Sequence, residues 1–99
     1  MTPEVAARLS ALDISLMAEA KAYSIFARGN CLAVAQSTEA GFSSLGSSGM
    51  MTESGLAYLV WREGRPVLVA KGHEIEADAG QVEQLRKFSG DLKAALGVD

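Results

Sequence analysis

The fold is decided by residues 57–70, which read Ala-Tyr-Leu-Val-Trp-Arg-Glu-Gly-Arg-Pro-Val-Leu-Val-Ala. Two runs rich in β-branched and aromatic residues flank a short turn that contains Gly64, which is the pattern of a β-hairpin. Residues 22–35, Ala-Tyr-Ser-Ile-Phe-Ala-Arg-Gly-Asn-Cys-Leu-Ala-Val-Ala, repeat this pattern 35 positions earlier, with Gly29 in the turn. The two segments predict two hairpins that together form a four-stranded antiparallel sheet.

The repeat has two explanations, which the sequence alone does not separate. One is an internal duplication of a unit that contains one helix and two strands. The other is composition, because strands generally favour Val, Ile and Tyr, and tight turns generally favour Gly. Both explanations predict the same sheet.

The strand over residues 57–61 is apolar on both of its faces. Side chains alternate along a strand, so Tyr58 and Val60 point to one side while Leu59 and Trp61 point to the other. A strand with one face in water would alternate apolar with polar residues. One long and one shorter helix are too few to cover both faces of four strands, so the sequence predicts a homodimer. Its candidate interface residues are Tyr58, Leu59, Val60 and Trp61.

A helix is predicted at the N-terminal end of the chain. Thr2, Pro3 and Glu4 are typical of a helix start, and apolar residues follow at helical spacing as far as Leu16. Residues 17–22 are good helix formers. The helix is therefore expected either to continue to about residue 21 or to restart after Asp13.

The C-terminal helix is specified by its cap and its apolar stripe. Asp78 and Gln81 have the spacing of a capping box, and Gly97 is placed to end the helix. The stripe consists of Val82, Leu85, Phe88, Leu92 and Leu96. Gly90 lies inside this helix, and a close approach of the sheet backbone is the expected reason for it.

Small and polar residues dominate the segment between the two hairpins. Residues 38–40 are expected to begin a short helix that turns Phe42 and Leu45 inward, and residues 49–52 are expected to form a brief extra strand. The prediction is thus one α+β domain, residues 1–99, with an antiparallel sheet of four to five strands from two hairpins. N-terminal and C-terminal helices pack on this sheet. The element order αββ(α)ββα is similar to that of profilin-like and roadblock-like folds.

Composition narrows the classes of function. An apolar content of 48% against 21% charged residues is typical of a folded globular domain. A net charge of −3 without a basic cluster argues against nucleic acid and anionic membrane surfaces as partners. The single Cys31 cannot form an intramolecular disulfide, and no apolar run is long enough to span a bilayer, so a cytoplasmic location is expected.

The segment over residues 41–49 is the best candidate for a ligand site. Gly41 and Gly46 are spaced as in a phosphate-binding loop, but Ser47 stands where that motif requires lysine. Backbone N–H groups and serine hydroxyls can still bind a carboxylate or a phosphate. The candidate ligand-binding residues are Ser43, Ser44, Ser47, Ser48, Arg62 and Arg65.

Other chemistry is weakly represented in the sequence. His73 followed by Glu74 and Glu76 does not form the His-Glu-x-x-His zinc motif, and no metal or cofactor is expected. Cys31 lies in a predicted strand, where a buried thiol is the common case. The sequence therefore predicts a non-catalytic protein-interaction domain that binds itself or another protein. The alternative is an anionic-ligand-binding domain or an enzyme that uses residues 41–49, and the sequence leaves open whether the chain is an enzyme.

Overall fold

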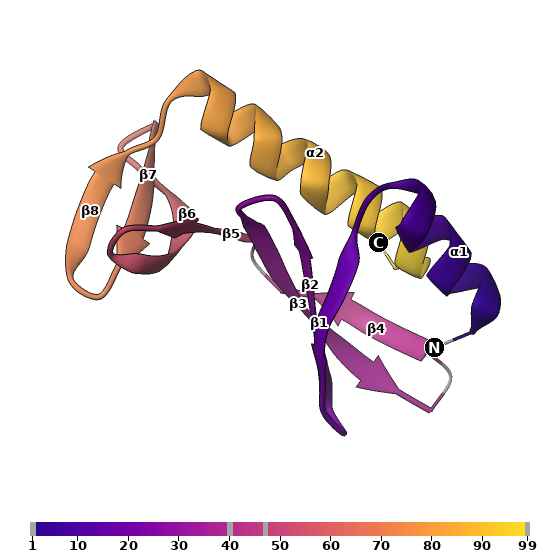
Figure 1. Ribbon diagram of the computed structural model, residues 1–99. Helices are drawn as coiled ribbons and strands as arrows, with labels where there is room; N and C mark the ends of the chain where they lie inside the picture. Colours follow the sequence, from indigo (N-terminus) through magenta and orange to yellow (C-terminus); the bar gives the residue numbers. More distant parts are fainter. Residues whose placement is uncertain (1, 40, 47, 99) are drawn as a thin grey trace.

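The computed structural model describes residues 2–39, 41–46 and 48–98 and shows an α+β fold (Figure 1). The elements run in the order α1 (Pro3–Ala11), β1 (Ser15–Glu19), β2 (Tyr23–Arg28), β3 (Cys31–Thr38), β4 (Gly41–Leu45), β5 (Gly49–Thr52), β6 (Gly55–Arg62), β7 (Arg65–Ala70), β8 (His73–Glu76) and α2 (Ala79–Leu96). Within the described residues the strands form one eight-stranded antiparallel sheet in the order β1-β2-β3-β5-β6-β7-β8, with β4 also paired to β3.

The predicted fold class is confirmed, but the predicted strand number is wrong. The sheet has eight strands where four to five were expected, because β1 and β4 arise from segments that were expected to be helical, and β8 (residues 73–76) was not counted among the expected strands. The resulting order of elements also differs from the profilin-like or roadblock-like order that was considered. Each of these three strands pairs with a strand next to it in the sequence, β1 with β2, β4 with β3 and β8 with β7, but its own residue pattern did not identify it as a strand.

Both predicted hairpins are present, as β2–β3 and β6–β7. In the first turn Gly29 alone has a positive φ, of 60°, as in a type II′ turn, whereas Glu63 and Gly64 both have positive φ values, as in a type I′ turn. The aligned glycines therefore occupy different turn positions. Tyr23 and Tyr58 are equivalent positions of the repeat, yet Tyr23 pairs with Gln36 and Tyr58 pairs with Val69. The register of the two hairpins therefore differs by two residues.

Helix α1 begins as predicted and ends just before Asp13, as the second alternative requires, but residues 15–19 then form a strand where a new helix was expected. The Thr2 hydroxyl accepts the Val5 N–H at 3.2 Å, and the helix stops at Ala11. Asp13 then adopts a left-handed conformation with φ of 58°. The chain reverses and continues as β1, which pairs with β2. Pairing with β2 thus overrides the helix propensity of residues 17–22, all of which are Ala, Glu, Met or Lys.

The segment after β3 forms a strand where a short helix was predicted. Residues 41–45 pair with the second half of β3, and Ala40 lies outside the described residues. Phe42 does turn inward, and its ring meets that of Phe26 edge to face at 5.7 Å. The predicted extra strand over residues 49–52 is confirmed as β5, which pairs with the first residues of β3 and with β6.

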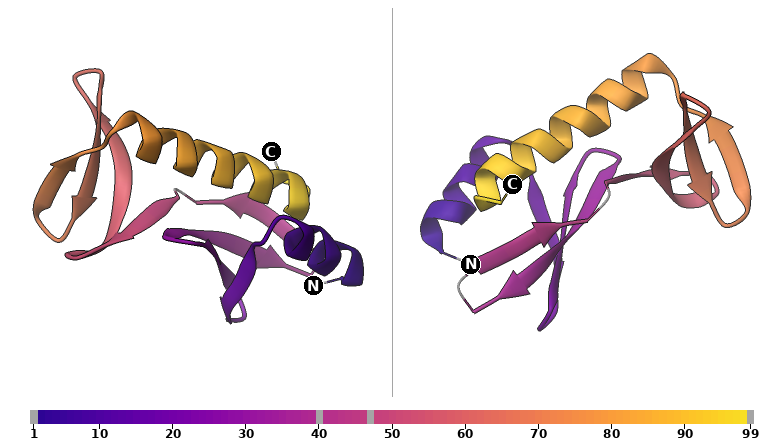
Figure 2. Two further views of the ribbon diagram at one scale, coloured as in Figure 1. Left: turned by 45° about the horizontal axis from the view of Figure 1, so that its top comes forward. Right: turned by 180° about the vertical axis from the view of Figure 1, so that it is seen from behind.

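Helix α2 is the element that holds the two ends of the sheet together. The capping box is present: the Gln81 N–H donates to Asp78 Oδ1 at 2.8 Å, and the Asp78 N–H donates to Gln81 Oε1 at 3.0 Å. Figure 2 shows α2 running along one face of the sheet from the end near β8 to the end near α1. The buried side chains of this face and of the helices form one core: Leu9, Ile14, Phe26, Cys31, Ala33, Ala35, Met50, Ala57, Leu68, Ala70, Leu85, Phe88, Leu92, Ala95 and Leu96.

Gly90 does not have the role expected of it, and this leads to a stability prediction. A Cβ atom added to Gly90 would meet no atom within 4 Å, so no sheet backbone approaches this position. Gly90→Ala is therefore expected to raise the free energy of unfolding by about 1 kcal/mol, because alanine restricts the unfolded chain and favours the helix. Urea denaturation of the two proteins measures the difference. A lower stability of the variant would contradict the open surroundings of Gly90.

Candidate functional site

The sheet has one covered face and one face without a helix. In β6, Ala57 lies on the covered face and is buried, whereas Tyr58, the next residue, lies on the opposite face and is 41% exposed. The ladder pairs Tyr58 with Val69 and Val60 with Val67, so these four residues share that side. We call this side the outer face.

The outer face continues across the sheet as an apolar surface. Ile25 pairs with Val34 on the same side, and the neighbouring Tyr23 is 56% exposed. Only apolar surface lines a shallow cavity of about 330 Å³ there, formed by Ala18, Ala20, Tyr23, Ile25 and Val34. Residues that pair across neighbouring strands point to the same face, so the strand pairs identify the large apolar side chains of the outer face. They are Tyr23, Ile25, Leu32, Val34, Met51, Leu56, Tyr58, Val60, Val67 and Val69.

The four predicted interface residues do not lie on one surface. Tyr58 and Val60 belong to the outer face, while Leu59 is half-buried on the side of α2. Trp61 also points to the α2 side, is 58% exposed and lines a groove of about 240 Å³ with Val82 and others. The sequence pattern found two apolar faces correctly, but α2 covers only one of them.

The described serines of the predicted ligand site lie on β4 and directly before β5. Ser43 and Ser44 are exposed, and the Ser44 hydroxyl donates to Gln36 Oε1 at 3.2 Å. The Ser48 hydroxyl is hydrogen-bonded to that of Ser89 in α2. Ser47 lies outside the described residues. Among the described serines of this segment, Ser43 and Ser44 belong to β4 and Ser48 directly precedes β5, so these three do not gather around one point.

The predicted ligand-binding arginines lie in the other half of the molecule. Arg62 and Arg65 face each other at the end of the β6–β7 ladder. Arg62 is paired with Glu74, and Arg65 Nη1 lies 3.5 Å from Glu76 Oε1. Figure 1 shows β4 and the β6–β7 hairpin at opposite sides of the fold, so Ser43 and Ser44 are not brought together with the arginines, whereas Ser48 lines a groove with Trp61 of β6.

Cys31 and His73 have different surroundings. Cys31 is buried beside Met50 across the β3–β5 ladder, and burial raises the pKa of its thiol, while the charge of Arg28 acts in the opposite direction. His73 is exposed at the start of β8. In the described ranges, no three His, Cys, Asp or Glu side chains are placed to hold a metal ion.

The buried thiol makes stability depend on pH in the alkaline range. The folded protein holds the Cys31 proton more tightly than the unfolded chain, whose thiol has a pKa of about 8.5. This contribution is complete below the unfolded pKa and is lost as pH rises toward the folded value. Between about pH 8 and about pH 10, wild type should lose more stability than Cys31→Ala in urea titrations. Parallel pH profiles would contradict this expectation.

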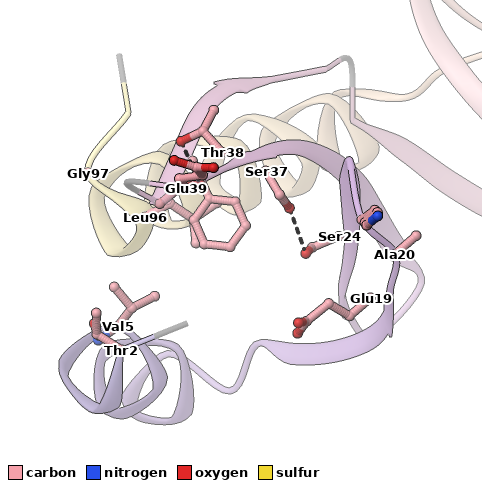
Figure 3. A pocket seen from close by; sticks show the side chains of 13 residues that line it. Thr2, Val5, Glu19, Ala20, Ser24, Ser37, Thr38, Glu39, Leu96 and Gly97 are labelled. Atoms are coloured by element: carbon pink, nitrogen blue, oxygen red, sulfur yellow. Dashed lines mark hydrogen bonds between the residues drawn. The ribbon is translucent and has the colours of Figure 1, made fainter.

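A second cavity, of about 480 Å³, lies between α1, the end of β1, and the β3–β4 hairpin (Figure 3). Its wall carries Ser24, which is only 2% exposed and whose hydroxyl lies 3.2 Å from that of Ser37. Sequence reasoning missed this cavity. The sequence contained one indication of it: Ser24 is a polar residue on the same face of β2 as the buried Phe26.

Across the part of the chain that the structure describes, neither helix is long and apolar enough to cross a membrane. Comparisons with protein-family models, with curated proteins and with solved structures gave no match to this chain.

Proposed function

We propose that this chain is a protein-interaction domain whose partner is a second copy of itself, bound through the outer face. The observation that supports the proposal is the apolar outer face, on which Tyr23, Met51 and Tyr58 remain exposed while both helices pack with the core of the opposite face. Contiguous apolar surface that stays exposed on a folded domain is typical of interaction sites. Aromatic residues such as Tyr58 are typical of the energetically important centre of an interface.

Both signs of charge border the outer face, which suits a symmetric contact. Arg62 and Arg65 lie beside Glu74 and Glu76, and all four residues are on the same face of strands β6, β7 and β8 as Tyr58. In a twofold contact the same patch meets itself, so each arginine can approach a carboxylate of the other copy. Such mixed charge fixes orientation and adds less affinity than the apolar centre.

The experiment is a matched pair of lysine substitutions, measured by sedimentation velocity over a range of protein concentrations. Tyr58→Lys places a charge in the centre of the proposed interface, and Gln84→Lys places the same charge on an exposed position of α2. Wild type and Gln84→Lys are expected to dimerise, and Tyr58→Lys is expected to weaken dimerisation at least tenfold, because a buried unpaired charge is costly.

Two results would contradict the proposal. One is a monomeric wild type at about 100 μM, a concentration at which a specific dimer of standard interface size is expected to be populated. The other is equal dimerisation of the Tyr58→Lys and Gln84→Lys proteins, which would place the contact elsewhere. Circular dichroism spectra of both variants control for folding.

The anionic-ligand alternative remains a prediction for residues 41–49. A ligand that binds the native state must raise the melting temperature. An unchanged melting temperature across phosphate, nucleotides and carboxylates would count against it.

A further inference from the structure

The cavity of about 480 Å³ has a polar wall and an apolar wall. The polar wall carries the Ser24 and Ser37 hydroxyls, which Figure 3 shows facing each other. The apolar wall is formed by Val5, Phe42 and Leu96, which belong to α1, β4 and α2. A space of this kind suits a small molecule with a hydrocarbon part and a polar end.

The charges of the lining favour a cation. Glu19 and Glu39 lie on opposite sides of the cavity in Figure 3, and among the described residues of the lining Lys21 is the single basic one. Across residues 2–39, 41–46 and 48–98, none of these three side chains takes part in an ion pair. Two carboxylates against one ammonium group leave a net negative rim.

The two helix ends at the cavity do not change this balance. The N-terminal end of α1, with Thr2, and the C-terminal end of α2, with Gly97, both contribute to the lining. Their partial charges are of opposite sign and offset each other. The side-chain charges therefore decide the sign of the preferred ligand.

We propose that this cavity binds a small aliphatic amine, with its ammonium groups at Glu19 and Glu39 and its methylene chain against Val5, Phe42 and Leu96. The serine hydroxyls accept hydrogen bonds from the same ammonium groups. This site lies on the Ser24 side of β2, opposite the outer face, and shares Ala20 with the cavity of that face, so amine binding and self-association are tested separately.

The test compares three molecules of the same chain length by isothermal titration calorimetry at low ionic strength. Putrescine carries two ammonium groups, 1,4-butanediol is its uncharged counterpart, and succinate carries two carboxylates. Putrescine is expected to bind with a Kd of about 1 mM or tighter, given its few heavy atoms. The diol and succinate are expected to bind at least tenfold more weakly.

Matched variants locate the binding. Glu19→Gln combined with Glu39→Gln should weaken putrescine binding at least tenfold, since charge-assisted hydrogen bonds are lost. Glu83→Gln, an equivalent change on the exposed surface of α2, should leave the Kd unchanged. Each of three results would overturn the proposal: no putrescine binding up to about 10 mM, equal binding of the diol, or equal Kd values for the wild-type and Glu19→Gln/Glu39→Gln proteins. The Tyr58→Lys protein, tested in parallel, should bind putrescine normally whether or not the dimer forms.

Discussion

Replacing Phe88 by alanine is expected to lower the free energy of unfolding by about 3–5 kcal/mol, the usual loss for a fully buried phenylalanine. Phe88 is completely buried in the middle of α2, and the Arg28 guanidinium lies over its ring at 5.5 Å from the ring centre. The substitution removes apolar contacts and leaves a cavity at the point where α2 meets the sheet. Urea or thermal denaturation measures the loss.

Two further variants test whether the burial of the Phe88 ring is the cause of this loss. Phe42→Ala removes a ring that is only half-buried, and it should cost less than Phe88→Ala. A domain of this size has a total stability of about 5–15 kcal/mol, so Phe88→Ala can unfold the chain. Phe88→Leu keeps most of the volume and should remain folded with a loss that can be measured. Equal losses for Phe42→Ala and Phe88→Ala would contradict the described core.

Local sequence signals predicted α2 and the two hairpins because these elements are specified within a few residues. Asp78 and Gln81 satisfy each other's backbone groups at the start of α2, and Gly97 ends it with φ of 72°. The hairpins depend on turns of two residues at Gly29 and Gly64. None of these features requires knowledge of a distant part of the chain.

The strands β1 and β4 could not be predicted in the same way. Residues 15–19 are all exposed at an edge of the sheet, so they lack the alternating burial that identifies a strand. What makes them a strand is pairing with β2, together with the left-handed Asp13 that ends α1. In β4, Phe42 and Leu45 have the inward spacing of a helix turn, and only the pairing with β3 selects the strand.

The two candidate sites differ in how far apart their residues lie in the sequence. Alternation along residues 57–61 correctly indicated two apolar faces, and the outer face carries Tyr58 and Val60. The cavity at Ser24 is assembled from six elements, α1, β1, β2, β3, β4 and the end of α2. Residues so far apart in sequence carry no common pattern, and only the fold brings them together.

Arg28 links three elements, and Arg28→Met is expected to lower the free energy of unfolding by about 2–3 kcal/mol. Its Nη1 donates to the Leu12 carbonyl at 3.1 Å and to Asp91 Oδ2 at 2.9 Å, which connects β2 to the end of α1 and to α2. Methionine keeps much of the packing against Phe88 but leaves the partly buried carbonyl and carboxylate without their donor. Denaturation curves at constant pH measure the effect.

The matched control is Arg62→Met, because Arg62 also forms an ion pair, with Glu74, but both side chains are about half exposed. An exposed pair contributes little, so this substitution should change stability by less than about 1 kcal/mol. A double-mutant cycle between Arg28→Met and Asp91→Ala should give a coupling energy of about 1 kcal/mol or more. A coupling near zero, or equal effects of Arg28→Met and Arg62→Met, would show that Arg28 does not join α1, β2 and α2. Partial burial is therefore the reason for the difference expected between two arginine–carboxylate pairs of similar chemistry, since desolvation makes the loss of one partner costly at Arg28 and not at the exposed Arg62.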